Sequence, residues 1–196
     1  MGLNEGFCFF RTCDVALEIE DEVENWKDVT ANYSTRLSED IEAGLREQMR
    51  HIFKEFIKIK KVHDVIQDEN SWHEDKRKDL RKTSLYGKPA FLHCLFQAWV
   101  DVRSDEGMTD EVIREKIEKM DFDFTNDLWQ NVLFLGQESP PKMMTKPEDK
   151  KIMTYLIKHL LGHDFHGLDR DINWGIRNFE KRKRDINSDA TLPDPI

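Results

Sequence analysis

The sequence predicts a mainly α-helical fold, an irregular multi-helix bundle around a buried central helix, with room for one or two short strands. Three observations predict it. Residues 90–102 are apolar on nearly every side, which is typical of a buried helix. Residues 38–57 carry a broad apolar stripe at helical spacing. Residues 145–162 begin with a helix-start signal and end at Gly162, a residue type favoured at helix C-termini.

The length of 196 residues suits one domain with a real core. The 12 Phe, 5 Trp and 3 Tyr residues are enough to anchor that core, so a disordered chain is excluded. We expect a single helical domain over residues 1–186, which is either complete or a portion of a longer protein. A mobile polar tail is expected over residues 187–196.

Charge, hydropathy and cysteine usage narrow the function classes. A net charge of −9 argues against a general nucleic-acid coat protein, but it leaves room for a local basic patch. The apolar runs are too short to span a membrane. Cys8, Cys13 and Cys94 show no metal-type pairing. Their odd number, without a signal peptide, predicts reduced thiols and a cytoplasmic location.

The first third of the chain predicts two helices. Residues 6–10 form a short apolar run, either a strand or a packed arm. Residues 12–29 favour a helix over a competing strand, because Val15, Ile19, Val23 and Trp26 recur at helical spacing. Ser38 can cap the next helix. Its apolar stripe consists of Ile41, Leu45, Met49, Ile52, Phe53, Phe56 and Ile57. Residues 67–82 then read as a charged connector with at most a short helix.

The middle of the chain begins with Gly87-Lys88-Pro89, which starts the central helix with proline in its first turn. Thr109 begins a short helix whose inward residues are Ile113, Ile117 and Met120. Residues 129–135 are either a strand or a packed helix end. Residues 136–141 are a loop, because two consecutive prolines cannot continue a helix.

The last predicted helices follow this loop. Thr145 and Glu148 match a capping box, and Pro147 suits the first helical turn. Ile152, Leu156 and Leu160 form the inward stripe. Trp174, Ile176 and Phe179 then predict one or two further packed turns.

Two groups of residues suggest chemistry. His159, His163 and His166 are close in sequence, but Gly162 ends the helix between them. The helix dipole explains histidines at such an end without a ligand, so we predict no metal and no cofactor. The stretch Arg46–His51 is similar to the R-x4-H pattern of HEPN ribonucleases, in which the Arg and the His act on the scissile phosphate. Glu47 replaces the usual polar residue there, and its charge would repel a phosphate.

Basic runs at residues 58–61, 76–82 and 181–184 are either solvated faces or phosphate contacts. The last run, Lys181, Arg182, Lys183 and Arg184, is the predicted nucleic-acid contact, because four adjacent cations before a tail can reach phosphates at little cost to the core.

Two segments, Lys82–Leu95 and Asp127–Gln137, are followed by the predicted helix at 152–161. Together they resemble the C-terminal half of the DGQHR-motif proteins, a group that includes DndB, a component of DNA sulfur-modification systems. The DGQHR peptide and the α/β half that carries it are absent from this sequence. The resemblance implies a helical portion or truncated relative from a prokaryote or phage, linked to DNA modification.

The sequence therefore predicts a non-enzymatic helical module of a DNA-modification or phage-associated system, which contacts DNA or a partner protein and no membrane. One alternative is a HEPN-like ribonuclease that uses Arg46 and His51. Another is a helical interaction module without a nucleic-acid role.

Overall fold

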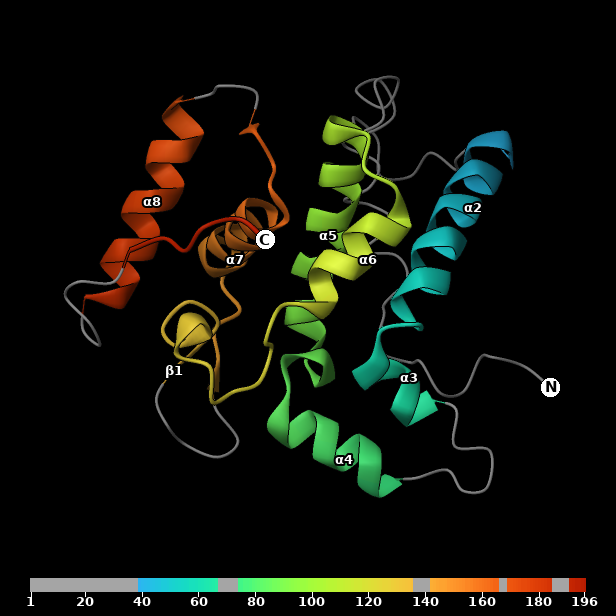
Figure 1. Cartoon of the computed structure of the whole chain (residues 1–196), viewed down its shortest axis with the longest axis horizontal. Helices are drawn as coiled ribbons and strands as arrows, with labels where there is room; N and C mark the ends of the chain where they lie inside the picture. Colours follow the sequence, from blue (N-terminus) through green and yellow to red (C-terminus); the bar gives the residue numbers. More distant parts are fainter. Residues whose placement is uncertain (1–38, 67–73, 136–141, 166–168, 185–190) are drawn as a thin grey trace.

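The computed structural model describes residues 39–66, 74–135, 142–165, 169–184 and 191–196. Within them it has seven α-helices and one two-stranded antiparallel sheet, so the prediction of a mainly α fold is confirmed (Figure 1). The expectations for residues 6–10 and 12–29, and for Cys8 and Cys13, lie outside the described residues. Among the described helices, none is both long and apolar enough to cross a bilayer.

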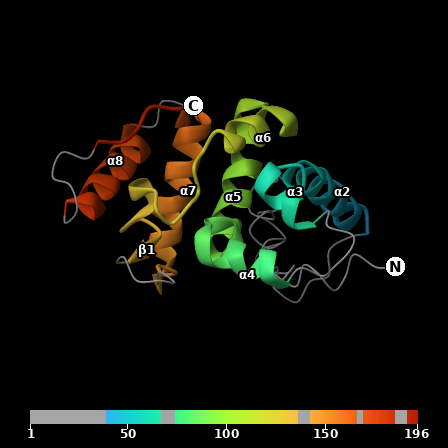
Figure 2. The same ribbon diagram turned by 60° about the horizontal axis from the view of Figure 1, so that its bottom comes forward.

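Helix α5 (Pro89–Glu106) is the central helix, as predicted for residues 90–102. It begins with Pro89 at its first position and ends at Gly107, whose φ of 62° lies in the left-handed region that favours glycine. Leu95 and Trp99 near its middle are fully buried. Figures 1 and 2 both show α7 and α8 on one side of α5, and α2 and α3 on the other.

The N-terminal side consists of α2 (Glu39–Phe56), α3 (Lys60–Ile66) and α6 (Asp110–Glu118). Helix α2 packs on α6 and buries Ile52 and Phe56 of the predicted stripe, whereas Ile57, the last residue of that stripe, follows the end of the helix and is exposed. The rings of Phe56 and Phe96 have centroids 5.0 Å apart, which joins α2 to α5. Thr109 caps α6 by accepting a hydrogen bond from the Val112 N–H, as predicted.

The charged connector predicted for residues 67–82 contains more helix than expected, because α4 (Glu74–Thr83) covers its last nine residues. Leu80 packs against the core and orients this helix. The 3-10 helix η1 (Leu85–Gly87) follows. A Cβ atom added to Gly87 would lie 2.5 Å from the Arg81 Cα atom, so only glycine allows η1 to fold back this closely on α4.

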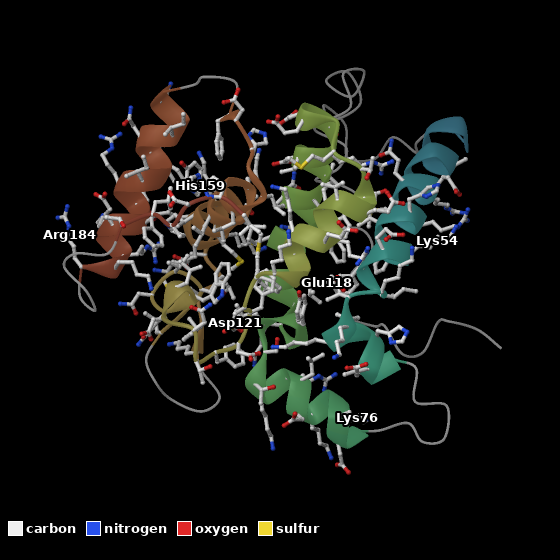
Figure 3. The ribbon with its side chains drawn as sticks, viewed as in Figure 1. Lys54, Lys76, Glu118, Asp121, His159 and Arg184 are labelled. Atoms are coloured by element: carbon white, nitrogen blue, oxygen red, sulfur yellow. The ribbon has the colours of Figure 1, made fainter. Side chains whose placement is uncertain are left out.

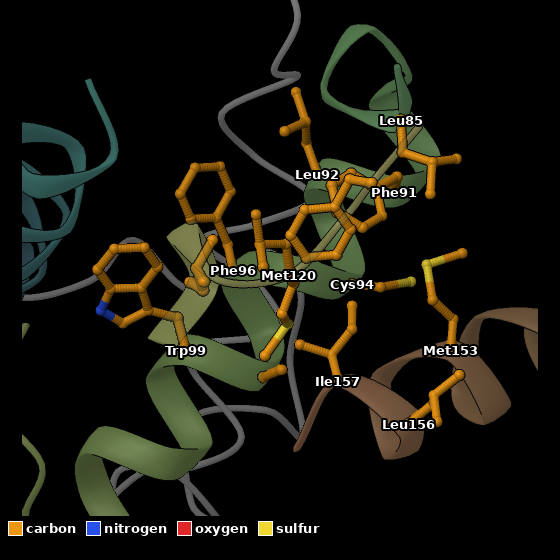
Figure 4. Close-up of a cluster of buried hydrophobic side chains, with 14 of the residues drawn as sticks. Leu85, Phe91, Leu92, Cys94, Phe96, Trp99, Met120, Met153, Leu156 and Ile157 are labelled. Atoms are coloured by element: carbon orange, nitrogen blue, oxygen red, sulfur yellow. The ribbon is translucent and has the colours of Figure 1, made fainter. Parts of the chain in front are cut away.

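Aromatic rings fill the core between η1, α5 and the segment after α6. Phe122 lies at their centre, with ring centroids 4.8 Å from Phe91, 5.2 Å from Tyr86 and 5.1 Å from Trp129. The buried indole of Trp129 donates its N–H to the Asp121 carbonyl oxygen at 2.7 Å. Figure 4 shows how side chains of α5 and α7 meet in this core, with Met153 and Ile157 of α7 turned towards α5.

Residues 129–135 form neither a long strand nor a helix end. The 3-10 helix η2 (Asp127–Trp129) leads through a turn, in which Asn131 has a φ of 61°, into the short strand β1 (Phe134–Leu135). Strand β1 pairs with β2 (Lys142–Met143), and Phe134 lies opposite Met143.

Helix α7 (Pro147–Leu161) buries Ile152, Leu156 and Leu160 and ends at Gly162, as predicted. The predicted capping box of Thr145 and Glu148 is displaced by one residue. Lys146 is the N-cap, and its backbone N–H donates to Asp149 Oδ2 at 3.0 Å. The reason is a tertiary contact, since Asp149 is buried and faces α8, whereas Glu148 is exposed.

Residues 191–196 lie against α7, which differs from the mobile tail predicted for 187–196. The Ile196 N–H donates to the Leu160 carbonyl oxygen at 2.9 Å. The Pro193 carbonyl oxygen lies 2.8 Å from His159 Nε2. Carbonyl groups in the last turn of a helix lack hydrogen-bond donors within the helix, and the Ile196 N–H is such a donor for α7. Residues 187–190 lie outside the described residues.

Candidate functional site

Positive charge is concentrated between residues 142 and 184, whereas residues 185–196 after them carry three Asp and no Lys or Arg. Residues 142–184 contain eleven Lys and Arg against six Asp and Glu, a net charge of +5, whereas the whole chain has −9. This segment forms β2, α7 and α8 (Asp169–Lys183). Such a separation of charge marks one end of the molecule as the part that attracts an anionic partner.

Helices α5, α7 and α8 surround a pocket of about 550 Å³, which we call the α7 pocket. Helix α5 contributes three polar residues at intervals of four, His93, Gln97 and Asp101, which lie on one face of the helix. The remaining lining residues are Thr145, Pro147, Lys150, Lys151, Thr154, Tyr155, Lys158, Phe165 and Trp174. The polar positions within the apolar stretch 90–102 of the central helix thus all face one site, and their spacing was the signal in the sequence that could have predicted it.

The bottom of the α7 pocket is a hydrogen-bonded network around Asp101. This carboxylate is 6% exposed and accepts from Gln97 Nε2 at 2.9 Å on one oxygen. Its other oxygen lies 2.7 Å from Lys158 Nζ. A buried carboxylate requires such partners, and the pair neutralises the charge of Lys158. Lys158 is therefore part of the scaffold of the pocket.

Lys150 and Lys151 also line the α7 pocket, at its rim. Lys151 is exposed and Lys150 is partly exposed. Among the side chains that the structure describes, neither has an ion-pair partner, in contrast to Lys158. Lys151 Nζ lies 4.6 Å from the centroid of the Trp174 ring, a cation–π distance. These two ammonium groups supply the uncompensated positive charge of the pocket.

Aromatic side chains form another part of the lining of the α7 pocket, which we call the aromatic wall. The rings of Tyr155 and Phe165 are stacked with centroids 4.7 Å apart. Trp174 of α8 meets Tyr155 nearly edge-on, with an angle of 75° and a centroid distance of 6.3 Å. A Cβ atom added to Gly175 would lie 1.9 Å from Tyr155 Cζ, so glycine allows α8 to sit directly on the Tyr155 ring. The pocket therefore combines an aromatic wall with a cationic rim.

The histidines are not brought together. His163 is buried, and its Nε2 atom lies 2.8 Å from Asp105 Oδ2 on α5. Its Nδ1 atom accepts from the Phe165 N–H at 2.8 Å, so Nε2 carries the proton. His159 faces Pro193, and His166 lies outside the described residues. No group of three or more potential metal ligands occurs in the described ranges.

The four residues of the basic run at 181–184 have different surroundings, because they lie on different sides of α8. Arg182 Nη2 pairs with Asp149 Oδ1 at 2.6 Å, which ties α8 to the first turn of α7. Lys183 is buried and donates to the carbonyl oxygens of Asp127 and Gln130. Lys181 and Arg184 are exposed. The structure thus leaves two of the four predicted phosphate contacts on the surface, because consecutive helical residues point in different directions.

Burial lowers the pKa of Lys183 from 10.5 to about 8, although Asp127 opposes the shift. Between these two pH values the unfolded chain holds more protons at this position than the folded chain. The free energy of unfolding of the wild type should therefore rise with pH in this window, relative to Lys183→Met, by on the order of 2 kcal/mol. Urea unfolding of both proteins at several pH values measures the effect. A constant difference between them across the window would contradict it.

Arg46 and His51 are both exposed on α2 and lie five residues apart, so they point about 140° apart around the helix axis. His51 Nε2 lies 3.2 Å from Glu47 Oε1. His51 lines a pocket of about 340 Å³ together with His63 and Glu111, and Arg46 does not line it. The structure therefore does not bring the two residues of the ribonuclease pattern to one site.

In the basic run at 58–61, some lysines form ion pairs with carboxylates of this chain. Lys58 pairs with Glu55, and Lys61 Nζ lies 2.6 Å from Asp123 Oδ1. In the run at 76–82, Lys76 and Lys82 are exposed on α4. Figure 3 shows Lys76 on this helix. Helix α4 carries five Lys and Arg against Glu74, Asp75 and Asp79, so these carboxylates offset part of its positive charge and leave a net charge of +2.

The two segments that resemble DGQHR-motif proteins meet in the core. Phe91 and Trp129, one from each segment, have ring centroids 6.5 Å apart. His93 is the residue of these segments that lines the α7 pocket. The helix at 152–161, which follows these segments in the expected resemblance, contributes Thr154, Tyr155 and Lys158 to the pocket. No protein-family model, no curated protein and no solved structure matches this chain.

Proposed function

We propose that the chain is a non-enzymatic helical module that binds DNA through the α7 pocket and the basic surface around it. The observation that carries this proposal is the pair of lysines, Lys150 and Lys151, on the rim. Their positive charge has no carboxylate partner among the described residues, whereas Lys158 a turn or two further along is neutralised by Asp101. Phosphate groups are the anions that such a cationic, aromatic surface attracts in nucleic acids.

The charge of the rest of the molecule sets the strength of binding. A DNA strand that approaches α7 is attracted by the local excess and repelled by a chain with a net charge of −9. Binding should therefore be weak at physiological ionic strength and should strengthen steeply at low salt. A link to DNA-modification systems, as the resemblance implies, fits such a module, which would bring DNA to a partner that carries the chemistry.

The test is the dependence of DNA affinity on salt concentration, measured by fluorescence anisotropy with a labelled oligonucleotide. The double variant Lys150→Ala/Lys151→Ala should flatten the slope of log affinity against log salt by roughly 1.4 to 1.8 units, the equivalent of two phosphate contacts. The matched control, Lys54→Ala/Lys119→Ala, removes the same charge. Lys54 lies on α2 at the other end of the molecule from α8, as Figure 3 shows. Lys54 and Lys119 are both exposed. This control should retain the wild-type slope.

Equal slopes for the two double variants would contradict the proposal, because the effect would then depend on net charge alone. No binding by the wild type at low salt would favour the alternative of a protein-interaction module. In the same experiment, Lys181→Ala/Arg184→Ala tests the basic run. This variant should flatten the slope of log affinity against log salt by at most roughly 1.4 to 1.8 units, the equivalent of two phosphate contacts. The reason is that Arg182 and Lys183 are turned inward.

A further inference from the structure

We propose that the α7 pocket takes a single unpaired nucleotide, with its base against the aromatic wall and its phosphate at Lys150 and Lys151. This inference rests on the proposed function and specifies its ligand. The chemical class is a planar heteroaromatic group that carries a phosphate one sugar away. A free mononucleotide and a nucleotide within a single strand share this chemistry.

The size of the pocket favours one nucleotide. Its volume of about 550 Å³ is within the range of roughly 300 to 1,000 Å³ that is usual for small-molecule sites. Bases in a duplex are stacked on both faces and cannot enter a concave pocket, whereas unpaired bases can. A duplex could contact only the rim, through its phosphates.

The walls have the two chemistries that a nucleotide needs. Phe165 and Trp174 belong to the lining of the pocket and provide apolar ring surface next to its lysines. Base–aromatic stacking tolerates any base, because every base has a π face. The hydroxyl groups of Thr145 and Thr154 belong to the same lining and can exchange hydrogen bonds with a sugar or a base edge.

The distance between the ring and the cation is what links the two chemistries. Lys151 Nζ lies over the Trp174 ring, 4.6 Å from its centroid, so a base that stacks on this face would displace the ammonium group towards the phosphate attached to that base. Lys150 precedes it in the first half of α7, near the positive end of the helix dipole. A phosphate attached through one sugar to a base on the aromatic wall would therefore meet both ammonium groups.

The experiment compares a short single strand of mixed sequence with its own duplex at one low salt concentration. The single strand should bind about tenfold more tightly, which is the lower range for one base stacked on an aromatic ring. Trp174→Leu should remove this preference, so that single strand and duplex bind equally, whereas Trp174→Phe should retain most of it. Thermal melting checks that both variants fold, and the Phe variant shows whether the loss is due to stacking.

Competition by deoxyadenosine monophosphate, with inorganic phosphate as the control, distinguishes the two sources of the nucleotide. Displacement of the strand by the mononucleotide, but not by phosphate, shows that free nucleotides enter. Displacement by neither, with the single-strand preference intact, assigns the pocket to a nucleotide within a strand. Equal affinities for strand and duplex that Trp174→Leu does not change would overturn the inference. In that case a salt slope that still depends on Lys150 and Lys151 would leave the proposed function standing.

Discussion

Leu95→Asp should lower the free energy of unfolding by about 3 to 5 kcal/mol, because it places an unpaired charge in the core. Leu95 is 0% exposed and lies near the middle of α5, the helix on which α6 and α7 pack. No compensating cation reaches a residue in this apolar layer, so the carboxylate would have to stay protonated or the helix would have to separate from its neighbours. Urea unfolding followed by circular dichroism measures the loss.

Leu95→Met is the matched control for this change. It keeps the apolar volume and should cost less than about 1.5 kcal/mol. If Leu95→Asp unfolded at the urea concentration of the wild type, α5 would not be the buried centre of the molecule. The assignment of α5 as the central helix would then have to be abandoned.

Gly175→Ala should detach α8 from α7. An added Cβ atom would lie 1.9 to 2.4 Å from three atoms of the Tyr155 ring, closer than any real contact. Alanine is a better helix former than glycine by about 1 kcal/mol, which favours the variant if α8 is free. Overpacking a contact of this kind costs about 1 to 3 kcal/mol or more, and the ring has little room because Phe165 is stacked on it. The packing term should win, so the variant should be less stable than the wild type.

A double-mutant cycle separates these two effects. In the Tyr155→Ala background the ring is absent, so Gly175→Ala should be neutral or stabilising there. The measurement is the free energy of unfolding of all four proteins. A stabilising Gly175→Ala in the wild-type background would contradict the close packing of α8 on Tyr155. The α7 pocket would then lack the wall that Trp174 provides.

The sequence predicted those parts of the fold that depend on local patterns. An apolar surface all round α5, the stripe that includes Ile52 and Phe56, and the cap of α6 at Thr109 can each be recognised from neighbouring residues. The start of α7 could not be predicted in this way. Glu148 and Asp149 are both suitable acidic residues for its first turn, and the choice depends on Arg182, which is distant in sequence.

The candidate site is a second case in which the sequence pattern was incomplete. Lys181, Arg182, Lys183 and Arg184 form a conspicuous run, but the packing of α8 directs two of them inward. The α7 pocket is assembled from three helices, so its residues are scattered along the chain. The sequence does contain two signals of this pocket. One is the spacing of four residues between His93, Gln97 and Asp101, and the other is the excess of Lys and Arg over residues 142–184.

The most direct test of the proposed DNA site is protection of lysines from acetylation by a bound oligonucleotide, read by mass spectrometry. Lys150 and Lys151 should react in the free protein and be protected when DNA is bound, since both lie on the rim of the α7 pocket. Exposed Lys54 and Lys119 should react equally in both states, because they lie outside this pocket. Protection of Lys54 and Lys119 with Lys150 and Lys151 still reactive would contradict the account and place the DNA on the other end of the molecule.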